Sequence, residues 1–288
     1  MSAPSLPSLL VSHWQLAWSI EVEVAAVAIV YLWAVRRLRG PWPLHRTLSF
    51  LAGLGCAVVA LQSGIDAYDD QMLSVHMVQH MLLLMVVPGL LIGGQPLIIA
   101  LRALPPRRRR ALARTVQRAR PYLGPAPSLG FFAAVVVLTH LSSFYDATLR
   151  HAALHDFEHA LYLTAGLLIW WQILGVDPVR SHRLGGLGRL GYMMAAMVPM
   201  SLVGVYLNRH TTLAYPAYGP AGHALGISAL DDQGLAGAIM WVVGDVIMVV
   251  VGLWAVLAAL VEDERRQQRA DAAAALTAAV PPVGGPRS

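Results

Sequence analysis

Seven long apolar runs divide this chain, and each is long enough to cross a lipid bilayer. A helix rises 1.5 Å per residue, so about 20 apolar residues cover a hydrocarbon core of roughly 30 Å. Only 13% of the 288 residues are charged, about half the share found in soluble domains. The sequence therefore predicts an all-α polytopic membrane bundle of seven transmembrane helices. The runs cover residues 16–35, 47–65, 72–100, 129–145, 152–175, 187–208 and 234–261.

The arginines predict how these runs are oriented. The chain has no lysine, and nineteen of its 21 arginines follow the odd-numbered runs, whereas Arg150 and Arg209 follow even-numbered ones. Cytoplasmic loops of membrane proteins carry the excess of basic residues. We therefore expect the N-terminus outside and the C-terminus in the cytoplasm. Because the basic charge serves topology in this pattern, we expect the lipid bilayer, and no nucleic acid, as its partner.

Three local features refine the predicted organisation. We expect residues 1–261 to form one membrane domain and residues 262–288 a cytoplasmic tail that is largely disordered at its end. The third run contains Pro88, Gly94 and Pro96, which predicts a kink or break in that helix. The arginine-rich segment 105–127 is typical of a short helix at the inner membrane surface.

Six of the eleven histidines gather at the predicted outer ends of runs three, four and five. His76 and His80 are four residues apart and share one helix face, as His155 and His159 do. Two imidazoles placed in this way can chelate one ion, whereas His140 alone could equally be an interhelical hydrogen-bond partner. The predicted metal ligands are His76, His80, His140, His155 and His159, with His151, Met77, Met81 and Glu158 as weaker candidates.

Copper is the metal that this set of donors favours most, and zinc and haem iron stay open. Imidazole suits copper, zinc and iron, while the thioethers of Met77 and Met81 favour Cu(I). Asp156 and Glu158 could orient imidazoles from outside the coordination sphere. Cys56 is the only cysteine, so a cysteine-based metal site within one chain is excluded.

Further acidic residues lie in the apolar runs. Asp245 is near the middle of run seven, where a carboxylate is costly, so we expect it to be paired, protonated or beside a wet cavity. Glu21 and Glu23 are two residues apart, so at most one of them faces the predicted site. No acid, base and nucleophile set is visible, so we expect no catalytic residues, no organic cofactor-binding residues and no enzyme activity.

Several motifs together resemble one known family. The segment His76-Met77-Val78-Gln79-His80, followed by Pro88 and Gly94-Gln95-Pro96-Leu97, is similar to the CtaG family of multi-span bacterial cytochrome c oxidase assembly factors. The resemblance covers about residues 10–260, and it continues through the following positions: His140, His155, Glu158, His159, Asp231-Asp232-Gln233, Gly237 and Met240-Trp241.

The resemblance implies a multi-pass protein of the bacterial plasma membrane that helps to deliver copper to a haem-copper oxidase. Its partners would be cytochrome c oxidase subunits. Some relatives are fused to a copper-resistance membrane domain, so a separate copper chaperone or copper-resistance membrane protein is a further expected partner.

The residues leave two other functions open. Paired helical histidines can also ligate haem iron, as in a membrane cytochrome. Asp245 and the broken third run would suit a metal- or proton-coupled transporter.

Overall fold

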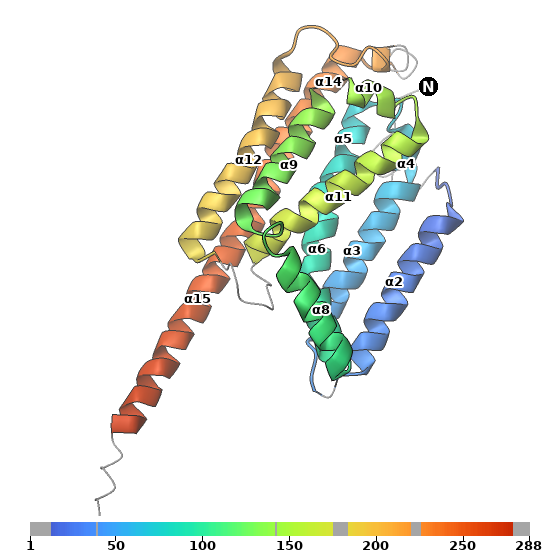
Figure 1. Cartoon of the computed structure of the whole chain (residues 1–288). Helices are drawn as coiled ribbons and strands as arrows, with labels where there is room; N and C mark the ends of the chain where they lie inside the picture. Colours follow the sequence, from blue (N-terminus) through green and yellow to red (C-terminus); the bar gives the residue numbers. More distant parts are fainter. Residues whose placement is uncertain (1–12, 39, 142, 175–183, 220–225, 279–288) are drawn as a thin grey trace, which may run out of the picture.

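The computed structural model describes residues 13–38, 40–141, 143–174, 184–219 and 226–278. Within these ranges the regular elements are all helices, arranged as an elongated bundle (Figure 1). Five stretches are long and apolar enough to cross a membrane, which supports a multi-pass membrane protein. They are Trp18–Arg36, Leu44–Tyr68, Leu73–Ala103, Gly186–Arg209 and Ala229–Ala258.

Two of the seven predicted runs form helices that do not belong to these five. Run four is α9, Pro125–His140, which has 16 residues. Run five is α11, Ala152–Leu174, which has 23 residues and carries His155, Glu158 and His159 in its first two turns. Both helices pack against other helices of the bundle, and His140 of α9 and Glu158 and His159 of α11 are buried there.

Apolar side chains cover much of the exterior of the bundle. Trp18 on α2 (Trp18–Arg36), Leu202 on α12 (Gly186–Arg209) and Val250 on α15 (Gly244–Ala278) are all more than half exposed. A soluble monomer rarely exposes contiguous apolar surface on this scale. The outward faces of these helices are therefore suited to lipid.

The helices from runs three, four and five are direct neighbours. The third run begins as α5 (Leu73–Met81), continues as the π-helix η1 (Leu82–Val86) and then as α6 (Val87–Gly93). α11 packs against η1 and α6 on one side and against α9 on the other. α14 (Ala229–Ala238), which opens the last span, packs against α5. This arrangement brings the predicted ligand helices together.

The predicted break in the third run is confirmed at Gly94 and Gln95. Gln95 adopts a left-handed backbone, with φ 52°, before α7 (Pro96–Ala103) begins. A Cβ at Gly94 would lie 2.6 Å from Cβ of Phe50, so glycine lets α3 (Leu44–Gln62) close onto the break. Tyr31 donates a hydrogen bond to the carbonyl of Gly94 at 2.8 Å.

Contact between α11 and the third span depends on Gly166. A proline at position 88 has no N–H to donate to the carbonyl of Leu84, four residues earlier. Gly166 packs directly against that carbonyl, because a Cβ there would lie 2.3 Å from the Leu84 oxygen and 2.5 Å from Cγ of Pro88. The missing side chain therefore sets how closely α11 approaches η1.

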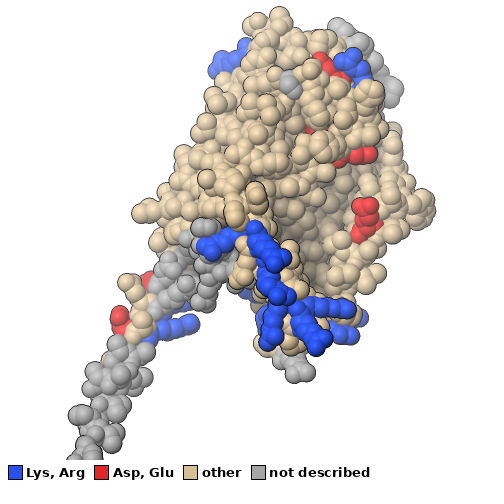
Figure 2. Space-filling model, viewed as in Figure 1, with Lys and Arg blue, Asp and Glu red and all other residues tan. Residues whose placement is uncertain are grey.

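The other end of the bundle carries most of the basic charge. α8 (Pro106–Ala119) contains six arginines and has no buried residue. Figure 2 shows most of the blue side chains, all arginines in this lysine-free chain, gathered around this end. α15 continues as one helix to Ala278 and projects beyond the bundle (Figure 1). The helix predicted within residues 105–127 is confirmed, and its position at a membrane surface stays a prediction.

Two short helices complete the end where the histidines lie. α4 (Gly64–Tyr68) follows α3, and its N-cap Ser63 accepts a hydrogen bond from the backbone of Ile65. α10 (Phe144–Thr148) joins α9 to α11. α4 packs against α5, and α10 packs against α11.

Candidate metal site

The start of α5 is anchored by a carboxylate from another helix. Met72, at the N-cap position of α5, offers no capping side chain. Asp232 of α14 instead accepts a hydrogen bond from the backbone N–H of Leu73 at 2.7 Å and another from the hydroxyl of Ser74. Capping groups of this kind satisfy free helix N–H groups and suit the positive end of the helix dipole. The first turn of α5, just before His76, is therefore fixed to the last span.

His76 and His80 face each other at the centre of the site. Their Nε2 atoms are 2.8 Å apart, and both side chains are fully buried. Two nitrogens bound to one metal at 2.0–2.1 Å with a right angle between them would be about 2.9 Å apart. The observed spacing is that of a hydrogen bond between the two rings, and it is also close to the spacing of two ligands of one ion.

Tyr218 fixes the tautomer of His76. The Tyr218 hydroxyl donates to the backbone carbonyl of Asp69 at 3.0 Å, so its oxygen is left to accept from Nδ1 of His76 at 3.1 Å. Burial raises the pKa of the Tyr218 phenol well above its ordinary value, so the hydroxyl keeps its proton. With the hydrogen on Nδ1, Nε2 of His76 presents its lone pair to His80.

A glutamine holds the loop that carries Tyr218. Gln233 on α14 accepts a hydrogen bond from the backbone N–H of Ala214 at 2.7 Å and donates to the carbonyl of Leu207 at 3.3 Å. In the same loop, Tyr215 donates to the carbonyl of His140 at 2.7 Å. Asp232 thus positions α5, and its neighbour Gln233 positions the loop that carries Ala214, Tyr215 and Tyr218.

Glu158 completes the inner group, which we define as His76, His80 and Glu158. Oε2 of Glu158 lies 3.9 Å from Nε2 of His76 and 3.8 Å from Nε2 of His80. The carboxyl is fully buried, and neither of its oxygens has a hydrogen-bond partner among the described residues. Nδ1 of His80 is likewise buried without a partner. Such unsatisfied buried groups are costly unless a proton or a metal ion neutralises them.

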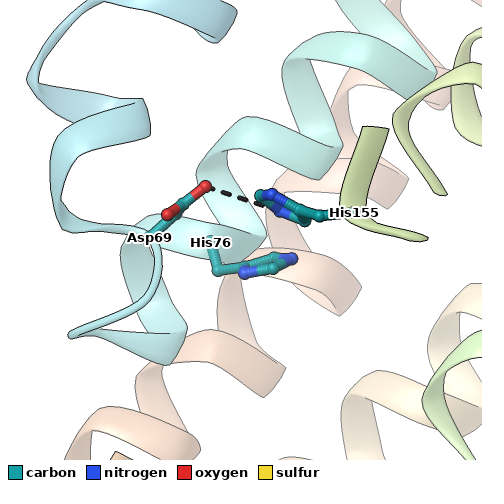
Figure 3. A group of neighbouring side chains, drawn as sticks. All are labelled: Asp69, His76 and His155. Atoms are coloured by element: carbon teal, nitrogen blue, oxygen red, sulfur yellow. Dashed lines mark ion pairs between the residues drawn. The ribbon is translucent and has the colours of Figure 1, made fainter. Parts of the chain in front are cut away.

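A second group shares His76 and lies closer to the surface. This outer group consists of Asp69, His76 and His155, whose ligand atoms all lie within 4.8 Å of one another. Figure 3 shows the Asp69 carboxyl and the His155 ring facing each other, with Oδ2 3.5 Å from Nε2. Burial raises the pKa of Asp69 to about 8, with a further contribution from the charges of Asp66 and Asp70. In the metal-free protein this carboxyl therefore holds a proton near neutral pH.

The other predicted histidines flank these two groups. His140 donates through Nδ1 to the carbonyl of Val136 at 2.9 Å, which leaves its buried Nε2 without a partner, and its ring centre is 5.8 Å from that of His80. His159 contacts Oε1 of Gln79 at 3.2 Å, and its ring centre is 4.2 Å from that of His155. His151 is exposed. None of these three belongs to the inner or the outer group.

The remaining predicted donors have different surroundings. Met77 and Met81 are buried in the apolar core, and the Met81 sulfur lies 3.4 Å from the position that a Cβ of Gly244 would take. Asp156 is exposed. Glu158, predicted both as a weaker ligand and as a residue that orients imidazoles, lies within 4 Å of Nε2 of His76 and of His80. The ligand roles of both methionines stay predictions.

Sequence reasoning missed three residues of the site. Asp69 belongs to an acidic segment just before His76, a position that could have indicated its proximity. Gln79 lies inside the histidine motif and donates to the carbonyl of Ala60 at 2.9 Å and to Asp66 at 3.0 Å. Tyr218 is 142 residues from His76 in sequence, and nothing in its neighbourhood identifies it.

The other acidic residues that the sequence analysis placed in apolar runs belong to neither the inner nor the outer group. Asp245 is partly buried on α15 and accepts a hydrogen bond from the hydroxyl of Ser201 on α12 at 2.8 Å, while its Oδ1 has no hydrogen-bond partner among the described residues. Glu21 and Glu23 lie on α2, which packs against α3 and α7. Neither glutamate belongs to the inner or the outer group.

Comparisons with known proteins identify one family model and several uncharacterized relatives. The family model for the cytochrome c oxidase caa3 assembly factor, Caa3_CtaG, matches residues 29–261. The chain is 33% identical over 237 residues to uncharacterized protein Mb0105 of Mycobacterium bovis, covering 77% of this chain and 36% of that protein. It is 30% identical over 257 residues to uncharacterized protein ML1998 of Mycobacterium leprae, covering 83% of this chain and 39% of that protein. The chain thus spans well under half the length of these relatives, and no solved structure matches it.

Proposed function

This chain belongs to the cytochrome c oxidase caa3 assembly factor family, and we propose that it serves assembly by holding copper transiently in its inner group. One observation carries the proposal. Two imidazole nitrogens 2.8 Å apart and a carboxylate oxygen within 4 Å of both are buried together, and the carboxylate has no hydrogen-bond partner among the described residues. Such a set is what a divalent or monovalent metal ion would satisfy.

The membrane topology is part of this proposal. Seven crossings, with α9 and α11 as the fourth and fifth, would place nineteen arginines on the cytoplasmic side, as the positive-inside rule requires. The N-terminus would then lie outside, the C-terminus inside, and both histidine groups near the outer surface of a bacterial plasma membrane. Metal would be exchanged on that side.

Copper fits the chemistry of the inner group as cargo. Imidazole is a good ligand for copper, and two imidazoles with one carboxylate leave coordination positions open. A client oxidase subunit could donate a ligand to an open position and remove the ion by ligand exchange. His140 is an additional donor in this proposal, because its buried Nε2 has no partner among the described residues and its ring centre is 5.8 Å from that of His80. The chain would act as a carrier in this scheme and not as an enzyme.

The nitrogen spacing favours a single ion over haem. Two histidines on opposite sides of a haem iron would have their nitrogens about 4 Å apart, twice the metal–nitrogen bond length. The nitrogens of His76 and His80 are 2.8 Å apart and lie on the same helix. A porphyrin ring could not lie between them without separating them.

Copper retention tests the proposal directly. The protein would be purified in detergent, loaded with Cu(I) under reducing conditions or with Cu(II) without reductant, desalted and assayed for bound metal. We expect the wild type to retain copper and His76→Ala/His80→Ala to lose it. The matched control His45→Ala/His210→Ala removes two histidines outside both groups and should retain copper.

Two further measurements make the result decisive. Thermal unfolding of the metal-free proteins would establish that His76→Ala/His80→Ala is folded. A parallel loading with Zn²⁺ would compare the two metals. Equal copper retention by the wild type and His76→Ala/His80→Ala would overturn the proposal.

A further inference from the structure

A polar pocket opens beside the outer group at the histidine end of the bundle. Its volume is about 330 Å³, and acidic and imidazole side chains line it along with Gln15, Thr148 and Arg150. Exposure falls along its wall: Asp70 and His151 are exposed, Asp66 and His155 are partly buried, and Asp69 is buried. The pocket therefore leads from the surface to the outer group.

The pocket and the buried histidines meet at Asp69 and His155. Both residues line the pocket, and their candidate ligand atoms lie within 4.8 Å of a ring nitrogen of His76. The Oδ2 atom of Asp69 and the Nε2 atom of His155 are buried and have no hydrogen-bond partner among the described residues. These two atoms are therefore free to bind a cation that reaches the floor of the pocket.

His76 belongs to both groups. The outer group joins it to Asp69 and His155, and the inner group joins it to His80 and Glu158. Its Nε2 lies 2.8 Å from Nε2 of His80, and one of its ring nitrogens lies within 4.8 Å of the ligand atoms of Asp69 and His155. A metal ion could therefore keep this ligand while it exchanges the others.

We propose that this pocket is the route by which copper reaches the inner group, and that Asp69, His76 and His155 form a second metal site on that route. The inference rests on the proposed function. The ion first binds the outer group, and His80 and Glu158 then displace His155 and Asp69 while His76 stays bound. The oxidation state of copper does not change, and each ligand released is replaced by another. The proton on Asp69 passes to water when the ion binds and is taken up again when the ion moves on.

The donor chemistry explains why the route would have two stages. Carboxylate and imidazole donors suit a hydrated Cu²⁺ ion arriving from water. The carboxylates of Asp66 and Asp70 in the wall of the pocket attract cations, and electrostatic focusing of this kind increases association rates by 10–10³-fold. The inner group is fully buried, so its ion would be shielded from water and from small chelators.

Loading kinetics test the route. The metal-free protein in detergent would be mixed with Cu²⁺, stopped by rapid desalting at successive times and assayed for metal. We expect Asp70→Asn to load more slowly because it removes a charge from the wall of the pocket. Asp69→Asn should load more slowly by about tenfold because it removes a ligand of the outer group. The control Asp231→Asn removes an exposed charge near the start of α14, outside the pocket, and should load at the wild-type rate.

A second pair of substitutions isolates the outer site. His80→Ala/Glu158→Gln removes two inner ligands and leaves Asp69, His76 and His155 intact. We expect this variant to bind Cu²⁺ but to release it to an added chelator at least tenfold faster than the wild type, because the remaining site borders the pocket. Unfolding of each metal-free variant would confirm that it is folded.

The outcomes separate the two proposals. A wild type that retains no copper would overturn the proposed function, and this route with it. A wild type that retains copper while Asp69→Asn and Asp70→Asn load at its rate would overturn the route alone. Absence of Cu²⁺ binding by folded His80→Ala/Glu158→Gln would overturn the second site.

Discussion

Replacing Gly166 with alanine should disturb the metal site from two turns away. The new Cβ would lie 2.3 Å from the Leu84 carbonyl oxygen and 2.5 Å from Cγ of Pro88, where ordinary contacts are 3.4–4 Å. One of these neighbours is backbone and the other is a rigid ring, so neither can turn aside. The helices would have to separate by about 1 Å, the difference between these distances and ordinary contact.

The expected cost follows from two opposing effects. Overpacking a close contact costs about 1–3 kcal/mol, whereas alanine is favoured over glycine inside a helix by about 1 kcal/mol. We expect Gly166→Ala to lower the free energy of unfolding by up to about 2 kcal/mol. Glu158 lies about 12 Å away along α11, and its distance from His76 and His80 should increase. Changes that misplace a ligand cost 10–100-fold in metal affinity, so we expect at least a tenfold loss for copper.

Three glycines supply matched controls. A Cβ at Gly89 would meet Trp170 of α11 at 3.5 Å, an ordinary contact at the same helix interface. A Cβ at Gly55 or Gly130 would meet nothing within 4 Å. Unfolding in mixed detergent would measure the free energy of unfolding of each variant. Competition with a chromophoric copper chelator would measure its affinity for copper. If Gly166→Ala matched Gly89→Ala in both, the close approach of α11 to η1 would not be what positions Glu158.

Other contacts give predictions of their own. Tyr218→Phe removes the hydroxyl that contacts Nδ1 of His76 and should weaken copper binding by about tenfold. If chemical unfolding showed that the free energy of unfolding falls by more than about 2 kcal/mol, Tyr218 would have a structural role instead. Asp232→Ala removes the cap of α5 and should cost about 0.5–2 kcal/mol, whereas the exposed neighbour Asp231, substituted in the same way, should cost less in the same assay. Gly237→Ala would place a Cβ 2.5 Å from the backbone nitrogen of Asn208 and 2.5 Å from the carbonyl oxygen of Gly204. It should therefore destabilise the contact between α12 and α14 by about 1–3 kcal/mol. In the control Gly234→Ala the new Cβ has only one contact, at 4.0 Å, and equal unfolding free energies for the two variants would contradict the prediction.

Apolar length, proline positions and histidine spacing determined much of this protein locally. The helices lie close to the predicted runs, the third run breaks beside Pro96, and His76 faces His80 as an i, i+4 pair must. These features depend on residues within one or two turns, so periodicity and backbone restrictions suffice to predict them. The π-helix after His80 had no such local marker.

Only the tertiary structure decided which donors share a site. His155 and His159 were an equally good pair by spacing, yet the packing of α11 directs Glu158 to the inner group and His155 to Asp69. Helical periodicity says which side chains share a face, but not how far the helix is rotated toward its neighbours. That rotation is set by contacts distant in sequence, including Gly166 against Leu84 and Asp232 on the first turn of α5.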